Sequence, residues 1–214
     1  MSVTTNKKFG LLKGLSDIYI CEIEDSDKEY KMVGTPEQLI PAGEMTVGKS
    51  IEKSQFYYDD AMWAEAGTES PSDMSIVGAA VRAALLAWIE GKTVDSATGA
   101  IIDDGDWHSK FYAISGKKGY TDGTSEYFWF LKCSFGGAEE SSKTKDNSTD
   151  ASGSTLPFTA YSTIFKFTKG NAHAKVVRID TADTKLKADA KWTAQVVTPD
   201  VLATVCEKVT ATQQ

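Results

Sequence analysis

The run Glu126–Phe135 (EYFWFLKCSF) is the most β-prone stretch of this 214-residue chain, and it decides the fold class. Its aromatic residues fall on both faces of an extended chain, because successive side chains of a strand point in opposite directions. A second strand is predicted from Lys110 to Ser115. The segment 116–125 (GKKGYTDGTS) has the glycines of a turn and joins the two strands as a long hairpin.

On both sides of this hairpin, segments with period-two alternation or strong β propensity predict further strands. Residues 34–43 have Gly and Pro at both ends and are expected to be a loop or an edge strand. The whole pattern predicts a mainly β protein, an antiparallel sandwich or barrel of roughly eight strands with one flanking helix. The further strand segments are 15–24, 30–33, 44–58, 156–168, 174–179 and 191–197.

One helix is predicted near residues 77–91, within the longer run Ser72–Lys92 (SDMSIVGAAVRAALLAWIEGK). Ser72 or Asp73 would be an early cap, and Gly91 stands where a left-handed stop belongs. Apolar residues surround the helix body almost completely, so the sheet or a neighbouring subunit must cover it on most sides. The residues expected to be buried are Val81, Leu85, Leu86, Trp88 and Ile89.

The organisation expected is a single domain over residues 14–214, preceded by a flexible arm at 1–13 and carrying a variable polar loop at 143–154. Residues 169–214 are placed in this domain by strand count alone. No window approaches the roughly 20 apolar residues of a membrane span, and no signal peptide opens the sequence. We therefore expect a protein made in a cytoplasm, with no membrane contact.

The formal net charge of −7 is unevenly distributed. Residues 1–149 contain 24 acidic and 15 basic side chains, whereas residues 150–214 contain 6 acidic and 8 basic ones. Proteins that hold DNA by its phosphates need clustered Lys and Arg. This balance argues against a DNA-gripping surface.

No catalytic or metal-binding pattern emerges from the polar residues, so we expect no enzyme, no cofactor and no metal. His108 and His173 stand beside turn residues without ligand spacing and are interpreted as surface residues. The cluster Asp103, Asp104 and Asp106 lacks the alternating ligands and closing Glu of a calcium loop. Three cysteines lie too far apart for a zinc site and are expected to be free thiols, the first two in the core: Cys21, Cys133 and Cys206.

The segment 56–63 (FYYDDAMW) places aromatic residues around an acidic corner, outside any clear strand pattern. We predict that it contacts another subunit, with an internal hairpin as the alternative. Asp59 and Asp60 could be imagined as the carboxylate pair of a glycosidase, but neighbours on a strand point to opposite faces and would cooperate only across a bend. The contact candidates are Phe56, Tyr57, Tyr58, Asp59, Asp60, Met62 and Trp63.

Taken in order, several segments resemble the major tail protein family of long, flexible-tailed phages of Gram-positive bacteria. The resemblance extends over roughly two-thirds of the chain, and the order and spacing of the segments carry it. They are GLSDIYICEI (14–23), YKMVGTPEQLIPAGEM (30–45), FYYDDAMWAEAG (56–67), LLAWIEGKTVDSATGAIIDD (85–104), FYAISGKKGYTDGTSEYFWFLKCSFGGAEESSKTK (111–145) and TLPFTAYSTIF (155–165).

This resemblance implies a tail-tube fold, a β-sandwich or barrel with one flanking helix, whose sheets join across subunits in a hexameric ring. Rings would stack around a tape-measure protein, with tail terminator and distal tail proteins as further partners. DNA would later pass through the lumen as a cargo that does not adhere. The implied location is the tail tube of the virion, assembled in the cytoplasm of the bacterial host.

Elementary physics agrees with this hypothesis, because subunits that polymerise need unpaired strand edges and apolar faces on a soluble monomer. The competing hypothesis is a monomeric β-sandwich binding module for a carbohydrate or protein ligand, with surface Trp and Tyr as its platform. An enzyme that uses Asp59 and Asp60 is the third.

Overall fold

The computed structural model describes residues 10–49, 51–103, 105–106, 108–140, 153–187 and 190–209. It confirms the mainly β fold with antiparallel sheets. The strands are β1 (Leu12–Asp25), β2 (Tyr30–Gln38), β3 (Ala42–Val47), β4 (Ile51–Tyr58), β5 (Ala61–Glu69), β6 (Ser72–Ala79), β7 (Thr93–Val94), β8 (Ile101–Ile102), β9 (Phe111–Tyr120), β10 (Ser125–Phe135), β11 (Glu139–Glu140), β12 (Gly153–Ala160), β13 (Val176–Asp180), β14 (Thr184–Leu186) and β15 (Cys206–Lys208). The helices are α1 (Ala83–Glu90), α2 (Ala190–Ala194) and α3 (Leu202–Val205), with a 3₁₀ turn η1 (Pro199–Val201).

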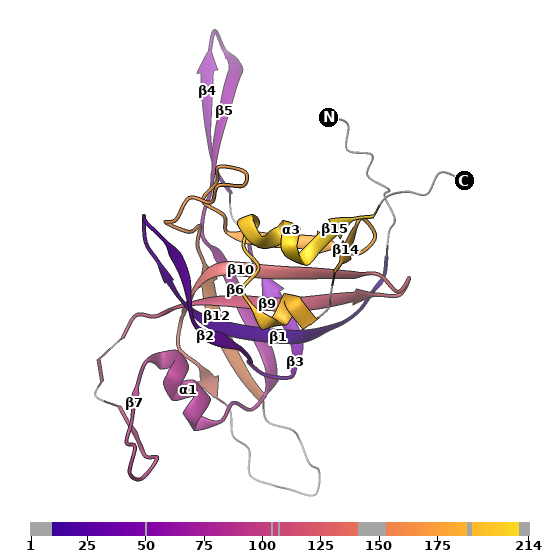
Figure 1. The fold of residues 1–214 in the computed structure, drawn as a ribbon. Coiled ribbons are helices and arrows are strands. Elements are labelled where there is room, and N and C mark those ends of the chain that lie inside the picture. The colour runs from indigo at the N-terminus through magenta and orange to yellow at the C-terminus, as the bar shows by residue number, and fades with distance from the viewer. Residues whose placement is uncertain are drawn as a thin grey trace, which may run out of the picture.

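The main sheet follows the order β2-β1-β9-β10-β12-β6-β3. β10 is where this sheet divides, because its residues 126–130 pair with β13 and its residues 133–135 pair with β12. The branch formed by β12, β6 and β3 crosses one face of β1, β9 and β10, and the two sets of strands enclose a common core (Figure 1). The predicted hairpin is therefore the centre of the fold.

The central strands are buried on both faces, since their alternate side chains enter two separate hydrophobic clusters. Phe128 and Phe130 point into the cluster shared with β6, β12 and α1. Trp129 and Leu131 point the opposite way, into a cluster shared with the chain that comes after β12. This arrangement explains why residues 127–131 of β10 are apolar without interruption instead of alternating with polar residues.

Residues 165–206 cover the second face of the central strands. Two fully buried tryptophans fix this cover: Trp129 Nε1 donates to the carbonyl of Trp192 at 3.0 Å, and Trp192 Nε1 donates to Ser115 Oγ at 3.2 Å. A buried indole N–H without a partner is destabilising, so these bonds select one seating of the C-terminal segment. Residues 191–197, predicted as a strand, include most of the short helix α2 instead.

The predicted helix is shorter than expected, because its first part is a strand. Residues 72–79 form β6, which pairs with β12 on one side and with β3 on the other, so Ser72 and Asp73 are not helix caps. Helix α1 begins at Ala83, after Arg82 in an extended conformation, and it ends as predicted at Gly91, whose φ is 71°. The apolar run at 76–81 fits either structure by its pattern, and the pairing of β6 in the sheet decides.

The expected burial of this helix is only partly correct. Ile89 is buried, and Val81 is buried although it precedes the helix. The other three residues, Leu85, Leu86 and Trp88, are half-buried and pack against the core from one side, because α1 lies at an edge of the sandwich (Figure 1).

Several other boundaries differ from the prediction. The opening strand begins at Leu12, so residues 12–13 do not belong to a flexible arm, and residues 44–58 are two strands, β3 and β4. The strand expected over 156–168 ends at Ala160. The loop expected at 143–154 lies outside the described residues up to 152, and residues 153–154 already belong to β12. Residues 30–38, predicted partly as loop or edge, form the edge strand β2.

Candidate functional site

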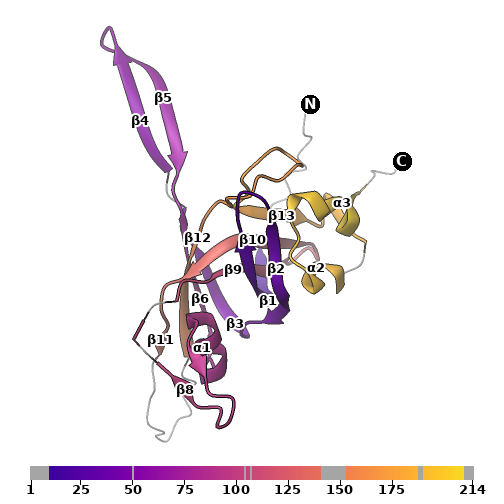
Figure 2. The same cartoon turned by 60° about the vertical axis from the view of Figure 1, so that its left-hand side comes forward.

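The feature that sets this molecule apart is a two-stranded arm, which we define as β4 and β5 with their turn, residues 51–69. Its strands pair with each other and with no other strand of the described chain. The arm lies between β3 and β6 in the chain, and it projects far beyond the rest of the molecule, the body (Figures 1 and 2). At roughly 3.3 Å per residue, its strands extend about 25 Å.

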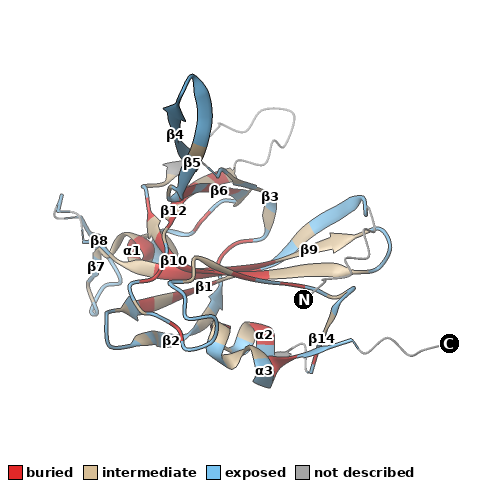
Figure 3. Cartoon of the chain, turned by 90° about the horizontal axis from the view of Figure 1, so that it is seen from above, coloured by how far each residue is buried: buried red, intermediate tan, exposed pale blue. Residues whose placement is uncertain are grey.

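Nearly every side chain of the arm faces solvent (Figure 3). All eight residues of β4 are exposed, and in β5 only Ala64 is half-buried. A hairpin of two strands is at best marginally stable in water, because it has no core of its own. The arm nevertheless carries six large exposed apolar side chains: Ile51, Phe56, Tyr57, Tyr58, Met62 and Trp63.

The tip of the arm is a two-residue turn at Asp59 and Asp60, with φ of 49° and 57°. Two consecutive left-handed residues match the type I′ turn, whose twist fits a hairpin. The two carboxylates therefore stand at a bend, the one arrangement in which the sequence allowed them to cooperate. Neither shows a hydrogen bond or ion pair in the described part of the chain, and they face open solvent rather than a cleft.

Just behind the turn, a bulge gathers the aromatic side chains. Phe56 pairs with Ala64 and Tyr57 pairs with Met62, so Trp63 is an extra residue on β5. Trp63 leaves 78% of its surface exposed, and its ring meets the edge of Tyr58 at a centroid distance of 5.7 Å. The seven predicted contact residues are thus brought together at the tip, as an internal hairpin that points outward.

Polar contacts connect side chains along the arm. Lys53 Nζ lies 2.7 Å from a carboxylate oxygen of Glu65, and the hydroxyl of Tyr57 donates to Gln55 Oε1 at 2.8 Å. Gln55 Nε2 also donates to Glu65. These bonds are exposed and individually weak, so they shape the arm without anchoring it. Ile51, near the base, is 57% exposed and carries no signal in the sequence that would mark it as a contact residue.

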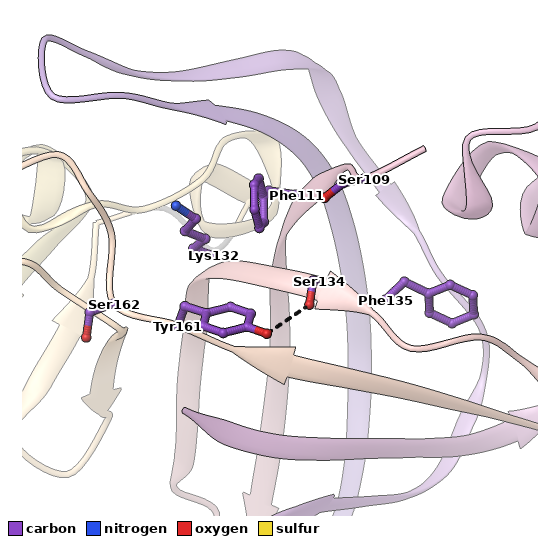
Figure 4. Close-up of a pocket in the computed structure, with 7 residues that line it drawn as sticks. All are labelled: Ser109, Phe111, Lys132, Ser134, Phe135, Tyr161 and Ser162. Carbon is purple, nitrogen blue, oxygen red and sulfur yellow. Dashed lines mark hydrogen bonds between the residues drawn. The ribbon is translucent and has the colours of Figure 1, made fainter. Parts of the chain in front are cut away.

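A hollow of about 410 Å³ lies on the body (Figure 4). Its floor contains Lys132, whose ammonium lies 4.5 Å from the centre of the Phe111 ring and 2.8 Å from Asp25. The hydroxyls of Ser134 and Tyr161 are 3.4 Å apart across it. Asp25 neutralises the lysine, so the hollow offers hydroxyls and aromatic edges but no uncompensated charge.

The remaining polar candidates assemble no site in the described residues. His173 Nδ1 lies 3.1 Å from the carbonyl of Thr163, His108 is exposed, and Asp104 lies outside the described residues. The described part of the chain contains no group of three or more His, Cys, Asp or Glu that could hold a metal. All three cysteines are buried free thiols. Among the helices that the structure describes, none is long and apolar enough to cross a membrane.

Comparison with known proteins assigns no family to this chain. No protein-family model matches the chain, and no curated protein matches it. A similar chain trace occurs in a cryo-EM structure of an extracellular contractile injection system, the PVC sheath–tube complex in its extended state. That chain overlaps with a TM-score of 0.40 and 10% sequence identity, over 76% of this chain and 87% of that one. A likeness at this level does not define a family.

Proposed function

We propose that this protein is a tail-tube subunit, which self-assembles into stacked hexameric rings and performs no catalysis. The observation that supports this most directly is the arm, which presents large apolar side chains on a hairpin without a core. The resemblance of residues 14–168 to phage major tail proteins supports the same class. In this proposal the seven tip residues contact another copy of the chain.

Assembly gives the arm the cover that the isolated chain lacks. Burying one aromatic side chain removes roughly 150–250 Å² from water, and each Å² of apolar surface contributes about 25 cal/mol. Trp63, Tyr58 and Tyr57 together therefore supply several kcal/mol, even after the loss of motional freedom on association. Six copies per ring multiply this contribution and make assembly steep in protein concentration.

The proposed class implies further partners: a tape-measure protein in the lumen, terminator and distal tail proteins at the ends, and DNA as passing cargo. A tube that conducts DNA must not hold it, because attraction to each phosphate, summed along a tube, would stop sliding. Acidic walls repel the phosphates, so we propose a lumen lined mainly by Asp and Glu from residues 1–149. The working location is the virion, after assembly in the host cytoplasm.

Concentration-dependent assembly tests this function. The purified full chain, monitored by size-exclusion chromatography and negative-stain microscopy up to millimolar concentration, is expected to form rings or tubes. A chain that remains a 23.2 kDa monomer across a range of salt concentrations would contradict the proposal. Assembled tubes are further expected to leave double-stranded DNA unbound at physiological salt. Tight binding in a sedimentation assay would remove the acidic-lumen part alone.

The second candidate is a monomeric binding module for a carbohydrate or protein ligand. The hollow beside Lys132 favours it, because its size falls in the usual range of small-ligand sites and it joins aromatic rings to hydroxyls. The two functions predict different results for one change, Tyr161→Ala. A binding module loses its ligand, measured by a glycan array or calorimetry, whereas tube formation through the arm continues.

A further inference from the structure

The base of the arm is tied to the body by one lysine that lies far away in the sequence. Lys175 Nζ donates to Glu69 Oε1 at 2.9 Å, to the carbonyl of Ser70 at 2.8 Å and to Ser72 Oγ at 3.3 Å. Glu69 is the last residue of the arm, and Ser72 is the first residue of β6. One ammonium group thus uses its three donors on the three residues that surround the joint.

Both ends of this connection are firmly placed. The side chain of Lys175 is only 12% exposed, and its own carbonyl accepts a bond from the amide of Leu131, which is fully buried in β10. Ser72 is fully buried and pairs with Ala160 of β12. The lysine therefore links the central sheet directly to the residues at which the arm joins the body.

Apart from Lys175, the joint is held through the backbone. On the returning side, Pro71 restricts the backbone between Glu69 and Ser72 but leaves the rotation about the Ser70 bonds in part open. On the outgoing side, the amide of Gly48 donates to the carbonyl of Asp73 at 2.7 Å, before the arm begins. These backbone links alone leave a two-stranded ribbon free to change its angle to the sheet, so side-chain contacts are needed to fix its direction.

We propose that Lys175 is a positioning residue that fixes the direction of the arm relative to the body. This inference rests on the proposed function for its purpose, since a contact between copies forms readily only when the arm already points at its target. With the arm held, an incoming copy meets one orientation. With Lys175 removed, the arm samples many orientations and association must select one of them.

The first experiment measures arm direction on the monomer, below the concentration of assembly. Spin labels on Ser54→Cys in the arm and Thr121→Cys in the body report one distance distribution by pulsed electron resonance. The native thiols do not interfere, because they are buried, and burial raises the pKa of Cys21 to about 11 and also raises those of Cys133 and Cys206. The expected result is a narrow distribution in the parent chain and a broad one in Lys175→Met.

Three variants separate positioning from general damage. Lys175→Arg keeps donors at the joint and is expected to restore the narrow distribution. Glu69→Gln cuts the ion pair from its exposed side and is expected to broaden the distribution, without risk to the core. Lys110→Met removes the same charge and a body ion pair with Glu22 at 3.0 Å, and it is expected to change nothing. Near-ultraviolet circular dichroism checks that every body is folded.

The second experiment measures assembly of the same variants. Lys175→Met is expected to raise the critical concentration for tubes roughly tenfold, since ordering a mobile segment at a contact opposes binding by an amount of this order. Lys175→Arg and Lys110→Met should assemble as the parent does. An unchanged distance distribution in folded Lys175→Met overturns the positioning role, and a broadened one with unchanged assembly overturns its link to tubes. A parent chain that never assembles defeats the proposed function alone, because the distance measurement stands on the monomer.

Discussion

The hairpin β9–β10 and the arm are built from similar material but meet opposite environments. Both are antiparallel pairs rich in aromatic residues. Trp129 in β10 is fully buried in the cluster that it shares with residues 165–206, whereas Trp63 in the arm is 78% exposed. The later parts of the chain make the difference: residues 165–206 fold back over β10, and nothing in the described chain folds back over the arm. An aromatic strand without its own cover is what a contact with another molecule requires.

The largest difference between the two hairpins is expected when the tryptophan is removed from each. Trp129→Ala creates a large cavity and leaves the carbonyl of Trp192 without its donor, so the free energy of unfolding should fall by about 3–5 kcal/mol. Trp63→Ala should change it by less than about 0.5 kcal/mol. Urea unfolding of the monomer, monitored by circular dichroism, measures both. A comparable loss from Trp63→Ala would mean that the arm packs on its own body.

Two ion pairs, one buried in the body and one exposed on the arm, test the same difference in environment. Asp25 has a fully buried side chain that accepts bonds from Lys132 Nζ at 2.8 Å and from the amides of Ile164 and Phe165. Lys132→Met leaves this carboxylate without its counter-charge and should lower the free energy of unfolding by about 3 kcal/mol.

The matched change in the arm is Lys53→Met, which breaks the exposed pair with Glu65. Exposed pairs contribute at most about 1 kcal/mol, so the monomer should be nearly unaffected. Thermal unfolding in low salt compares the two variants directly. Equal losses in the two variants would mean that solvent does not screen the ion pair of the arm.

Local signals in the sequence were enough for the centre of the fold. The hairpin at 111–135 has two β-prone runs around a glycine turn, and Gly91 marks a helix end that needs only its own backbone conformation. The helix predicted near 77–91 begins only at Ala83, because the apolar run at 76–81 fits both periods and only the pairing of β6 with β12 and β3 distinguishes them.

The candidate site was visible from sequence only in part. The cluster of aromatics around Asp59 and Asp60 marked the tip, since it lies within eight consecutive residues. No local pattern could show that this cluster would project, because exposure depends on what the rest of the chain leaves uncovered. Lys175 could not be found at all, as it lies 106 residues beyond Glu69 and is paired by the tertiary fold.

A smaller effect on the monomer, with a large one on assembly, is expected from the double change Tyr58→Ala and Trp63→Ala. It removes the edge-to-face pair at the tip while leaving the body untouched. Tubes should disappear in negative stain, and the far-ultraviolet circular dichroism should stay unchanged. The control is Val94→Ala with Ile102→Ala, two exposed apolar residues of the β7–β8 hairpin. Tubes formed by the tip variant would refute the contact, and tubes lost in the control alone would move it to β7–β8.

The smallest change is the protonation of one exposed carboxylate at the base of the arm. The hydrogen bond from Lys175, and then the charge of Lys175, lower the pKa of Glu69 below its ordinary value of 4.5, with a weaker contribution from Lys49. A lowered pKa means that the ionised form stabilises the joint. Its contribution is complete above pH 4.5 and is lost as the pH falls through the lowered value. We expect the distribution of distances between the labels on the arm and the body to broaden as the pH is lowered from 5 to 3. The near-ultraviolet circular dichroism spectrum of the body should persist. Glu69→Gln should be broad at both values, because it has no charge to lose. A parent distribution that stays narrow at pH 3 would show that the bonds of Lys175 to Ser70 and Ser72 hold the arm without Glu69.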